Sequence, residues 1–423
     1  MSMDPHIIIV GAGQAGLQAS ETLRAGGYEG QLTVLGDEPH LPYHRPPLSK
    51  AWLAGDMAVE QLAMRAEAAL ERKNITIRTA SPVAALDTAR RLVQLADGTQ
   101  LKYTGLLLAT GATPRQLPGQ SSGSADGCKA IRVLRSRDDA SAVSDCLRRC
   151  AEHGLPVVVI GGGFIGLEVA ATARKLGLPV TVLEAAPRLL GRVLAPVLSD
   201  WYATLHRARG AHLVLNARIA EIHPVNDHIA EVRLADGQSY RAGLVLVGIG
   251  VCANDALARA AGIACDNGIV VDACGRTSAP DVYAAGDCTA RRLDDGTLLR
   301  LESVQNAIEQ GRAAAAGLLG QDKPFTAVPW FWSDQYDKKL QIAGLSHGAD
   351  SWVVRGDMHA DTPFSVYHFR QGRLAAVDSI NSAKEHLAAR TVLTMPVPPT
   401  PEQVGSADFD LAAFAKAAQA AAA

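Results

Sequence analysis

Two glycine-rich segments have the spacing that binds the pyrophosphate of a dinucleotide. In the middle of the chain, residues 157–184 read VVVIGGGFIGLEVAATARKLGLPVTVLE. Within this segment Gly161 makes a tight turn, Gly163 lets the backbone approach the pyrophosphate, and Gly166 lets a helix pack on the sheet. The first N–H groups of such a helix have no partner within it, so they bind anions.

The acid that ends this segment predicts which nucleotide binds. Glu184 is placed to accept hydrogen bonds from a ribose diol, so it favours the free 2′-hydroxyl of NADH and repels the 2′-phosphate of NADPH. The neutral Ala185 and Ala186 supply no replacement cation, although Arg188 and Arg192 are nearby. A bare G-x-G-x-x-G arises often by chance, but one with both strands, the helix and the acid rarely does. The segment therefore predicts a site for NADH.

The same fingerprint stands near the N-terminus, where residues 11–16 read GAGQAG between a short apolar run and a helical pattern. Gly36 stands where the other copy has Glu184, so the candidate ribose acids are Asp37 and Glu38. Two fingerprints imply two dinucleotides. By family analogy, a first copy at the N-terminus and a second in mid-chain indicate a flavin nucleotide first and a nicotinamide nucleotide second.

The elements that must position these turns are repeated as well. Each fingerprint is followed by the hairpin signal Leu-Ala-Asp-Gly, at 95–98 and 234–237, and then by an apolar run that ends in glycine, at 105–111 and 244–250. Both halves therefore predict β-α-β, a small antiparallel insert and a closing parallel strand. Residues 116–130 are rich in Gly and Ser and predict a connector. The second nucleotide-binding domain is thus predicted to be inserted into the first.

Composition narrows the class of protein. The 423 residues predict about three domains at roughly 150 residues each. A net charge of −2 gives no reason to expect binding to nucleic acid or to an anionic membrane, and no apolar run approaches the ~18 residues that span a bilayer. The seven cysteines form no C-x-x-C pair and are typical of reduced thiols. We therefore expect a cytoplasmic protein without a membrane anchor.

Two further segments hold candidate polar ligands. The prolines of RPPLSK (45–50) predict a rigid extended segment that can hold Arg45 and Lys50 against a ligand, although a solvated proline-rich loop has the same composition. Gly286 and Asp287 end a short strand, and a helical pattern begins near Val304. A carboxylate held there can bind a polyol; the structural alternative for Asp287 is a helix N-cap.

Seven motifs occur in one order: VGAGQAG, RPPLSK, ATGATPR, GGGFIGLE, VYAAGDC, ESVQNAIEQ and PWFWSDQ. Together they resemble the FAD-dependent NADH:ferredoxin reductases of oxygenase systems, over residues 6–381. The resemblance implies an α/β fold of glutathione-reductase type with two Rossmann-like domains. It places an FAD domain at 1–114 and 251–325, an inserted NAD domain at 115–250, and a C-terminal α+β domain at 326–423.

The resemblance also implies the site residues, which fall into three groups. The FAD site falls on Gly11, Gly13, Ala15, Gly16, Asp37, Arg45, Lys50, Val83, Ala109, Thr110, Gly111, Arg135, Gly286, Asp287, Val304 and Trp332. The NADH site falls on Gly161, Gly163, Phe164, Ile165, Gly166, Glu184 and Gly250. Lys50 and Glu168 are implied to form an ion pair where flavin and nicotinamide meet. The structural alternative for Glu168 is an acid favoured by the helix dipole.

The implied reaction passes a hydride from NADH to FAD and then single electrons to a [2Fe–2S] ferredoxin. That ferredoxin would serve a cytochrome P450 or a ring-hydroxylating dioxygenase. In this scheme Lys50 stabilises negative charge near the reduced flavin, while Glu168 holds Lys50 and the nicotinamide amide. The alternatives are an NADH oxidase and a redox-responsive interaction protein of the apoptosis-inducing-factor type.

The cysteines argue against thiol chemistry. Disulfide reductases of this fold carry a redox cysteine just after the RPPLSK position, whereas the first cysteine here is Cys128 in the connector. Cys146 and Cys150 are spaced i, i+4 on a helical pattern, but no histidine or carboxylate cluster accompanies them, so we predict no metal site. The oligomeric state, monomer or weak dimer, stays open.

Aromatic residues gather in the last hundred residues, where alternating runs predict antiparallel strands and a helix from about residue 382. Because ferredoxins are acidic, a docking face should be basic. Candidate cations are Lys338, Lys339, Arg291, Arg292 and Arg300. Scattered solvated charges are an equally good interpretation of these five residues.

Overall fold

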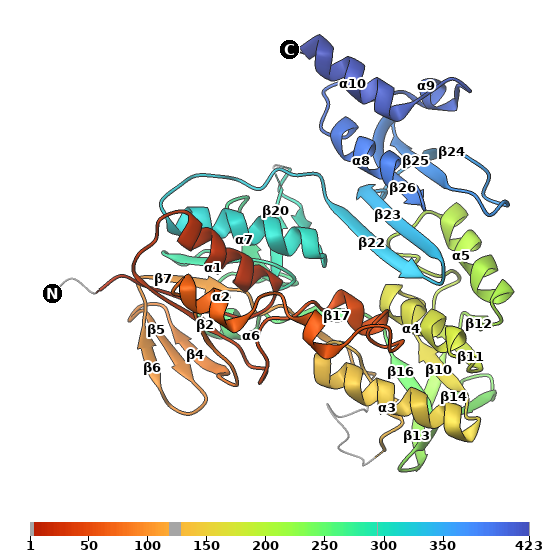
Figure 1. The fold of residues 1–423 in the computed structure, drawn as a ribbon, viewed down its shortest axis with the longest axis horizontal. Coiled ribbons are helices and arrows are strands. Elements are labelled where there is room, and N and C mark those ends of the chain that lie inside the picture. The colour runs from red at the N-terminus through yellow and green to blue at the C-terminus, as the bar shows by residue number, and fades with distance from the viewer. Residues whose placement is uncertain (1–3, 118–127, 294, 423) are drawn as a thin grey trace. The chain divides into compact units, whose positions relative to one another are not determined.

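The computed structural model describes residues 4–117, 128–293 and 295–422, and it divides into two compact units. Unit 1 comprises the described residues of Met1–His44, Val59–Thr113 and Val251–Ala327. Unit 2 comprises those of Arg45–Ala58, Pro114–Gly250 and Val328–Ala423. Figure 1 labels many of the elements of both units and colours the chain by residue number. Most of the predicted connector, at 118–127, lies outside the described residues.

Unit 1 is built on a parallel five-stranded sheet. The glycine turn follows its central strand, β1 (His6–Val10), which pairs on both sides over four or five residues. The strand order is β19 (Val282–Ala284), β7 (Gly105–Leu108), β1, β2 (Gln31–Leu35) and β3 (Thr76–Arg78). These strands are continuous apolar runs such as Ile7–Ile9 and Leu106–Leu108, as expected of a parallel sheet that is covered on both faces.

Each face of this sheet has its own core. On one face pack α1 (Gln14–Ala25) and α7 (Val304–Leu318), which cross so closely that a Cβ at Gly311 would lie 2.8 Å from the carbonyl oxygen of Ala15. On the other face lies the antiparallel sheet of β4 (Val83–Asp87), β5 (Leu92–Leu95) and β6 (Gln100–Lys102). The remaining elements are η2 (Val59–Leu62), α2 (Glu67–Arg72), β8 (Ala112–Pro114), β17 (Val251–Ala253), α6 (Ala256–Ala260), β18 (Ile269–Val271), β20 (Thr289–Arg292) and β21 (Leu298–Leu299).

The first half of unit 2 repeats that plan. Its parallel sheet has the order β12 (His212–Leu215), β11 (Val180–Glu184), β10 (Val157–Ile160), β16 (Leu244–Val247) and β9 (Ile131–Arg132). Its insert is the antiparallel sheet of β13 (Ile219–Asn226), β14 (Ile229–Leu234) and β15 (Ser239–Ala242). Its helices are α3 (Arg137–His153), α4 (Phe164–Lys175) and α5 (Pro196–Ala208). Both Asp-Gly turns join the predicted strands, with φ of +87° at Gly98 and +90° at Gly237.

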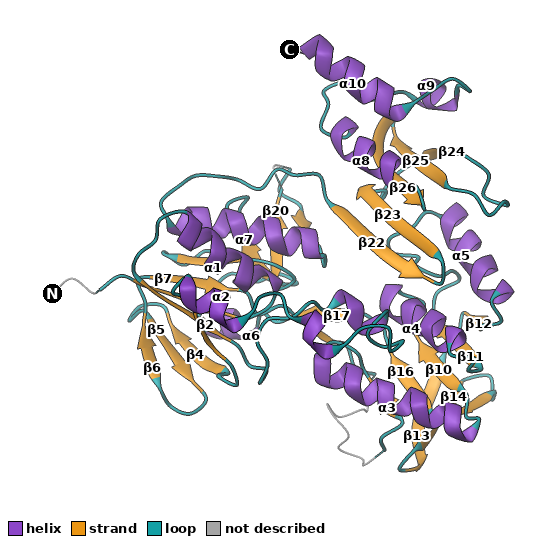
Figure 2. Ribbon diagram, viewed as in Figure 1, coloured by secondary structure: helices purple, strands orange, loops and turns teal. Residues whose placement is uncertain are grey.

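The second half of unit 2 is an antiparallel sheet. Its strand order is β22 (Trp330–Gln335), β23 (Lys338–Gly344), β26 (Arg373–Ile380), β25 (Phe364–Arg370) and β24 (Ser351–Arg355). One face packs on α8 (Ala383–Val392), α9 (Pro401–Gly405) and α10 (Leu411–Ala422), with Tyr367 and Phe369 in the core. In Figure 2 the strands of this sheet are orange, with the purple helices α8, α9 and α10 beside them.

The RPPLSK segment is not extended as predicted. Pro46–Ser49 form a 3-10 turn, η1, preceded by Arg45 in the helical region at φ −78° and ψ −33°. Proline fits the first turn of a helix because its fixed φ is already helical and the N–H groups there have no partner to lose. The turn places Ser49 and Lys50 at its C-terminal end.

Among the residues that the structure describes, no helix combines the length and the apolar character needed to cross a bilayer.

Candidate functional site

The first glycine fingerprint is required by close backbone packing. Gly11 has φ +113°, and a Cβ there would lie 2.0 Å from the carbonyl oxygen of Ala109. A Cβ at Gly16 would lie 2.0 Å from the carbonyl oxygen of Gly11. A Cβ at Gly13, in contrast, would meet no atom within 4 Å. Gly11 and Gly16 therefore serve the turn and the helix packing, and Gly13 opens onto free space.

The second fingerprint has the same geometry. A Cβ at Gly161 would lie 2.4 Å from the carbonyl oxygen of Gly248, and one at Gly166 would lie 2.2 Å from that of Gly161. A Cβ at Gly163 would again meet nothing within 4 Å. The three roles assigned to these glycines from their spacing are thus the same in both copies.

Both turns end at a helix start that suits a pyrophosphate. The N-caps of α1 and α4 are Gly13 and Gly163, neither helix start receives a side-chain cap, and neither first turn contains an acid. The first N–H groups of each helix therefore receive no side-chain cap, and no acid within the first turn neutralises the positive end of the helix dipole. Each cradle fits the diphosphate of a dinucleotide such as FAD or NADH.

The acid that follows the second fingerprint is held in place by the backbone. The Glu184 carboxylate accepts hydrogen bonds from the N–H of Gly162 at 2.6 Å and from the N–H of Ala186 at 2.7 Å. A carboxylate has about four acceptor positions, so two remain for a ribose diol. Arg188 is tied to its own loop, since it donates to the carbonyl oxygens of Leu194 at 2.5 Å and of Gly191 at 2.9 Å.

The first copy lacks this acid for a steric reason. A Cβ at Gly36 would lie 2.9 Å from the Cβ of Ala12, which stands where the second copy has Gly162. The candidate acids therefore come after the strand. Asp37 is exposed and accepts from the N–H of Glu38 at 3.1 Å, while Glu38 accepts from the hydroxyl of Tyr43 at 2.5 Å.

Side-chain bonds shape the ends of two other strands in unit 1. Asn254 donates to the carbonyl oxygen of Thr110 at 2.9 Å, and its own carbonyl oxygen accepts from the Thr110 hydroxyl at 2.7 Å. Gln310 on α7 accepts from the N–H of Gly286 at 2.7 Å and from the Thr289 hydroxyl at 2.8 Å. These bonds fix Ala109–Gly111 and the backbone that carries Asp287. The N-cap of α7 is Ser303, not Asp287.

Lys50 and Glu168 form the predicted ion pair. The distance from Lys50 Nζ to Glu168 Oε2 is 2.7 Å, and Glu168 is only 4% exposed. Ser49 Oγ donates to the same oxygen at 2.5 Å, and Ser333 Oγ donates to Oε1 at 2.7 Å. Glu168 is therefore a buried acceptor of three hydrogen bonds.

Strand alternation in β22 divides its side chains between two environments. Ser333 and Gln335 are fully buried, whereas Trp332 is half-buried and lies 5.7 Å from the ring of Trp330. Phe331 contacts Phe164 of the second fingerprint at 4.6 Å between ring centroids. The strand thus contacts the start of α4 through Phe331 and carries the neighbouring rings of Trp330 and Trp332.

The structure divides the predicted FAD residues between the units. Unit 2 holds Arg45, Lys50, Arg135 and Trp332, and within it Arg45 donates to the carbonyl oxygen of Arg135 at 2.9 Å. Unit 1 holds all the others, from Gly11 to Val304. The predicted NADH residues all lie in unit 2, where Gly250 has φ +99° and accepts from the N–H of Arg115 at 2.8 Å.

Sequence reasoning missed four polar residues that shape these sites: Ser49, Asn254, Gln310 and Ser333. A weak signal was present for two of them. Gln310 interrupts the small apolar residues on the buried face of α7, and Ser333 occupies a buried position in an aromatic run. Buried polar side chains require partners, so each such position marks a network.

The five candidate docking cations differ in their accessibility. Lys338 and Arg300 each have side chains only 11% exposed and are paired, Lys338 with Asp337 at 3.0 Å and Arg300 with Glu302. Arg291 lies over the ring of Phe325 at 4.6 Å. Lys339, with a 53% exposed side chain, and the exposed Arg292 are the two that a partner could reach.

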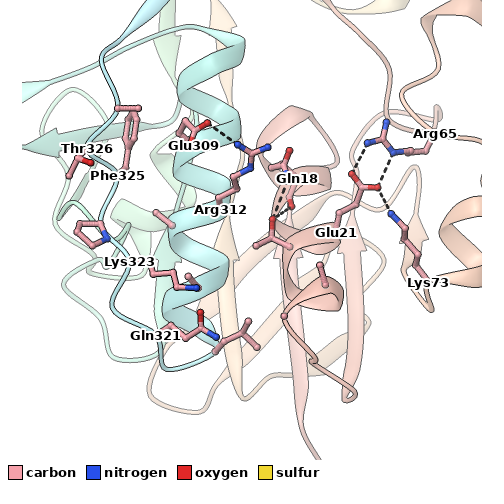
Figure 3. A pocket seen from close by; sticks show the side chains of 18 residues that line it. Gln18, Glu21, Arg65, Lys73, Glu309, Arg312, Gln321, Lys323, Phe325 and Thr326 are labelled. Carbon is pink, nitrogen blue, oxygen red and sulfur yellow. Dashed lines mark hydrogen bonds and ion pairs between the residues drawn. The ribbon is translucent and has the colours of Figure 1, made fainter. Parts of the chain in front are cut away.

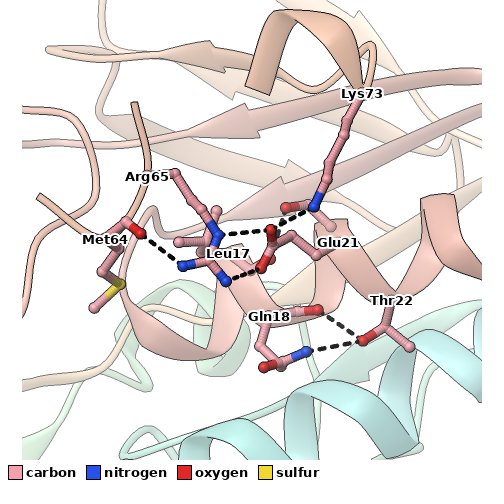
Figure 4. Close-up of polar contacts among 8 residues, drawn as sticks. Leu17, Gln18, Glu21, Thr22, Met64, Arg65 and Lys73 are labelled. Atoms are coloured by element: carbon pink, nitrogen blue, oxygen red, sulfur yellow. Dashed lines mark hydrogen bonds and ion pairs between the residues drawn. The ribbon is translucent and has the colours of Figure 1, made fainter. Parts of the chain in front are cut away.

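A groove of about 790 Å³ in unit 1 contains none of the predicted residues. It lies between α1, α7 and the segment that follows α7, as Figure 3 shows. In its wall Glu21 accepts from Arg65 at 2.9 Å and from Lys73 at 2.8 Å (Figure 4). These partners join α1 to the segment around α2, so we assign the cluster a structural role.

All seven cysteines are free thiols. Burial raises the pKa of the Cys146 thiol and raises that of Cys150 to about 11, so both are held as neutral thiols inside α3. Within the described ranges, no group of three His, Cys, Asp or Glu side chains could hold a metal ion.

Comparison with known proteins identifies relatives along the whole chain. The model of the pyridine nucleotide-disulphide oxidoreductase family matches residues 5–311, and the model of a reductase C-terminal domain matches residues 330–415. Rhodocoxin reductase from Rhodococcus erythropolis is 43% identical over 96% of this chain and 93% of its own length. Putidaredoxin reductase from Pseudomonas putida is 40% identical over 99% of both chains.

A solved structure agrees with these relatives. In the crystal structure of the covalent putidaredoxin reductase–putidaredoxin complex, one chain matches with a TM-score of 0.92 at 39% identity. The match covers 99% of this chain and 100% of the other. The names of these relatives favour an electron-transfer reductase over an oxidase or an interaction protein, and the predicted fold class is confirmed.

Proposed function

The chain belongs to the pyridine nucleotide-disulphide oxidoreductase family, and we propose that it is an FAD-dependent NADH:ferredoxin oxidoreductase. The observation that carries the proposal is the Lys50–Glu168 ion pair beside the second glycine turn. Disulfide reductases of this fold carry their redox cysteine just after this segment, and here Ser49 and Lys50 occupy it. The relatives that match nearly the whole chain are named as reductases of rhodocoxin and putidaredoxin.

We propose that the first fingerprint, at Gly11–Gly16, holds the diphosphate of FAD. Asp37 would bind the adenosine ribose, and Asp287, on the backbone fixed by Gln310, would bind the ribityl chain. Val83, Val304, Arg45, Arg135 and Trp332 would complete the site. In this assignment the FAD domain comprises 1–114 and 251–325, the NAD domain 115–250, and the C-terminal domain 326–423.

We propose that the second fingerprint holds NADH. The helix start at Gly163 receives the diphosphate, and Phe164, Ile165 and Gly250 line the rest of the site. Glu184 selects the free 2′-hydroxyl because its carboxylate is fixed by two backbone N–H groups and would repel a phosphate. Arg188 is committed to its own loop and cannot turn to a 2′-phosphate without losing those bonds.

When bound, the flavin accepts a hydride from NADH and can release the two electrons one at a time. The residues of the chain bind the two nucleotides, orient them and supply charge. Lys50 provides a fixed positive charge where negative charge develops, and Glu168 holds Lys50 in place. Because Ser49 and Ser333 also donate to Glu168, both oxygens of its carboxylate are held.

We propose a [2Fe–2S] ferredoxin as the electron acceptor and the cytoplasm as the compartment. The ferredoxin would serve a cytochrome P450 or a dioxygenase, since reductases of such systems resemble this chain. Lys339 and Arg292 remain the exposed candidates for its docking face.

The proposal is tested by following NADH consumption with and without a purified [2Fe–2S] ferredoxin. Rapid consumption that requires the ferredoxin is the expected result. Equally rapid consumption without it, accompanied by peroxide, would contradict the proposal and favour an oxidase. Ferricyanide serves as a control acceptor, because it tests flavin reduction without the docking step.

A further inference from the structure

The buried carboxylate of Glu168 stands at the end of a continuous chain of side-chain hydrogen bonds inside unit 2. From Glu168 Oε1 the chain passes to Ser333 Oγ at 2.7 Å and on to Gln335 Nε2 at 3.2 Å. Gln335 Oε1 then meets His206 Nε2 at 2.8 Å, and His206 Nδ1 meets the Tyr336 hydroxyl at 3.1 Å. Ser333, Gln335 and His206 are all 0% exposed.

Chemistry fixes the direction of every bond in this chain. Ser333 gives its only proton to the carboxylate, so its oxygen must accept from the amide N–H of Gln335. The carbonyl oxygen of Gln335 then faces His206, which must donate from Nε2. His206 Nδ1 is therefore an acceptor and receives the hydroxyl proton of Tyr336. All four bonds donate toward Glu168.

The ionisation of the two outer members supports this direction. Burial lowers the pKa of His206 to about 4, so at neutral pH the ring has one N–H and one acceptor nitrogen. Burial raises the pKa of Tyr336 to about 12, so its hydroxyl keeps the proton that it donates. Neighbouring hydrogen bonds that run in one direction polarise and strengthen each other.

The outer end of the chain is built at a cost in backbone energy. Tyr336 connects β22 to β23 with φ +59°, a region that a bulky side chain rarely adopts. The guanidinium of Arg209 lies over its ring at 5.4 Å and pairs with Asp337 at 2.5 Å. Tyr336 lies in the two-residue loop of a hairpin closed by Gln335 and Lys338, where such a φ is common, and this turn holds the Tyr336 hydroxyl beside His206.

We propose that His206 is a positioning residue for Glu168, an inference that rests on the proposed function. His206 Nε2–H orients the amide of Gln335, the amide makes Ser333 an acceptor, and Ser333 must then donate to Glu168. Without that N–H the amide of Gln335 can turn, and the Ser333 hydroxyl can donate to Gln335 in place of Glu168. The chain orients hydrogen bonds and does not carry a proton out, because the amide of Gln335 has no proton to pass on through its carbonyl oxygen.

The other charged and titratable groups that act on Glu168 do so independently of His206. Lys50 and Ser49 approach Oε2 from η1. Tyr202 on α5 is buried, and its pKa is raised first by burial and then by the charges of Asp378, Glu168 and Asp334. None of these groups bonds to His206, so changing His206 acts on Glu168 through Gln335 and Ser333.

The test compares His206→Leu and His206→Asn with His206→Gln. Glutamine places an N–H at the position of Nε2 and an acceptor beside Tyr336, whereas asparagine is one methylene too short to reach Gln335. Ser333→Ala removes the terminal donor. Ser379→Ala is the matched control, because Ser379 is equally buried in the same sheet but bonds to Ser365 at 3.0 Å.

Two measurements are made on each full-length variant: the rate of flavin reduction by saturating NADH, and the rate at which an acylating reagent modifies Lys50, followed by peptide mass spectrometry. We expect Ser333→Ala, His206→Leu and His206→Asn each to slow flavin reduction about tenfold, equivalent to about 1.4 kcal/mol. Modification of Lys50 should rise several-fold in the same variants. His206→Gln and Ser379→Ala should stay within about threefold of wild type in both measurements.

The double variant Ser333→Ala/His206→Leu decides whether the two residues act in one chain. We expect it to be no slower than Ser333→Ala alone, since His206 has no effect once Ser333 is gone. Additive losses, wild-type behaviour of both His206→Leu and His206→Asn, or equal losses in Ser379→Ala would overturn the inference. If His206→Leu does not fold, the pair of His206→Asn and His206→Gln still decides it. A wild-type protein that NADH fails to reduce would refute the proposed function, and the Lys50 modification rates would still test the chain.

Discussion

Substitution of Lys50 should lower the free energy of unfolding more than substitution of its partner Glu168. Lys50→Met leaves a carboxylate that is 4% exposed without a counter-charge. Breaking a buried ion pair from one side costs about 3–5 kcal/mol. The Lys50 side chain is 17% exposed, so water relieves part of this penalty and we expect about 3 kcal/mol.

Glu168→Gln should cost less. The amide can keep its carbonyl oxygen toward Lys50 and Ser49, but its NH₂ group then faces Ser333, whose hydroxyl proton loses its acceptor. The charge of the acceptor and the bond from Ser333 are lost, together worth about 2 kcal/mol. The double variant holds no buried charge, so we expect it to lose about 3 kcal/mol, well below the sum of the single losses.

The assay can report on unit 2 alone. All five tryptophans of the chain, from Trp52 to Trp352, belong to unit 2, which also contains the ion pair. Guanidinium unfolding followed by tryptophan fluorescence therefore measures the unit that the substitutions perturb. Losses that add within about 0.5 kcal/mol in the double variant would refute the coupling that the geometry requires.

Five other results should follow. Gly166→Ala should destabilise the protein by about 1–3 kcal/mol, because its Cβ would lie 2.2 Å from the carbonyl oxygen of Gly161. Gly163 has φ −84°, and a Cβ there would meet no other atom within 4 Å. The free energy of unfolding of Gly163→Ala should therefore stay within about 0.5 kcal/mol of wild type, while NADH titration shows weaker binding. The wild-type protein should have a higher kcat/KM with NADH than with NADPH. Glu184→Gln should reduce the ratio of these two kcat/KM values about tenfold, equivalent to about 1.4 kcal/mol. A wild-type preference for NADPH would contradict the role assigned to Glu184. Because the folded pKa of His206 is about 4 and its usual value is 6.5, the unfolded state binds more protons between these values. The neutral His206 therefore contributes about 3 kcal/mol to the free energy of unfolding above pH 6.5, and this contribution is lost as the pH falls toward 4. In His206→Gln the free energy of unfolding should depend less on pH over this range. Raised salt should slow ferredoxin reduction and leave ferricyanide reduction unchanged if docking is electrostatic, and equal sensitivity of both would argue against a basic docking face.

The glycine turns could be predicted from sequence because the spacing of their glycines is local. Gly16 contacts its own turn, whereas the contact that requires Gly11 lies on a distant strand, at Ala109. The repeated Asp-Gly hairpins are local for the same reason. The sequence also predicted the two parallel sheets, since buried parallel strands are continuous apolar runs.

The polar networks could not be predicted, because they depend on contacts between distant segments. Ser49 and Ser333 meet Glu168 across 119 and 165 positions of sequence, and Gln335 meets His206 across 129. The exposure of charged side chains could not be predicted for the same reason. Lys338 is largely buried and pairs with Asp361, 23 positions further along the chain. The error at η1 is different, since two prolines suit an extended segment and a first helical turn equally well.

The proposed reaction is best tested by anaerobic mixing of the flavin-loaded protein with NADH and then with an oxidised [2Fe–2S] ferredoxin. We expect NADH to bleach the visible absorption of the flavin and the ferredoxin to restore it, with two ferredoxin molecules reduced for each NADH consumed. Flavin that stays oxidised in the presence of NADH, or reduced flavin that the ferredoxin does not reoxidise, would show that the protein does not catalyse this reaction.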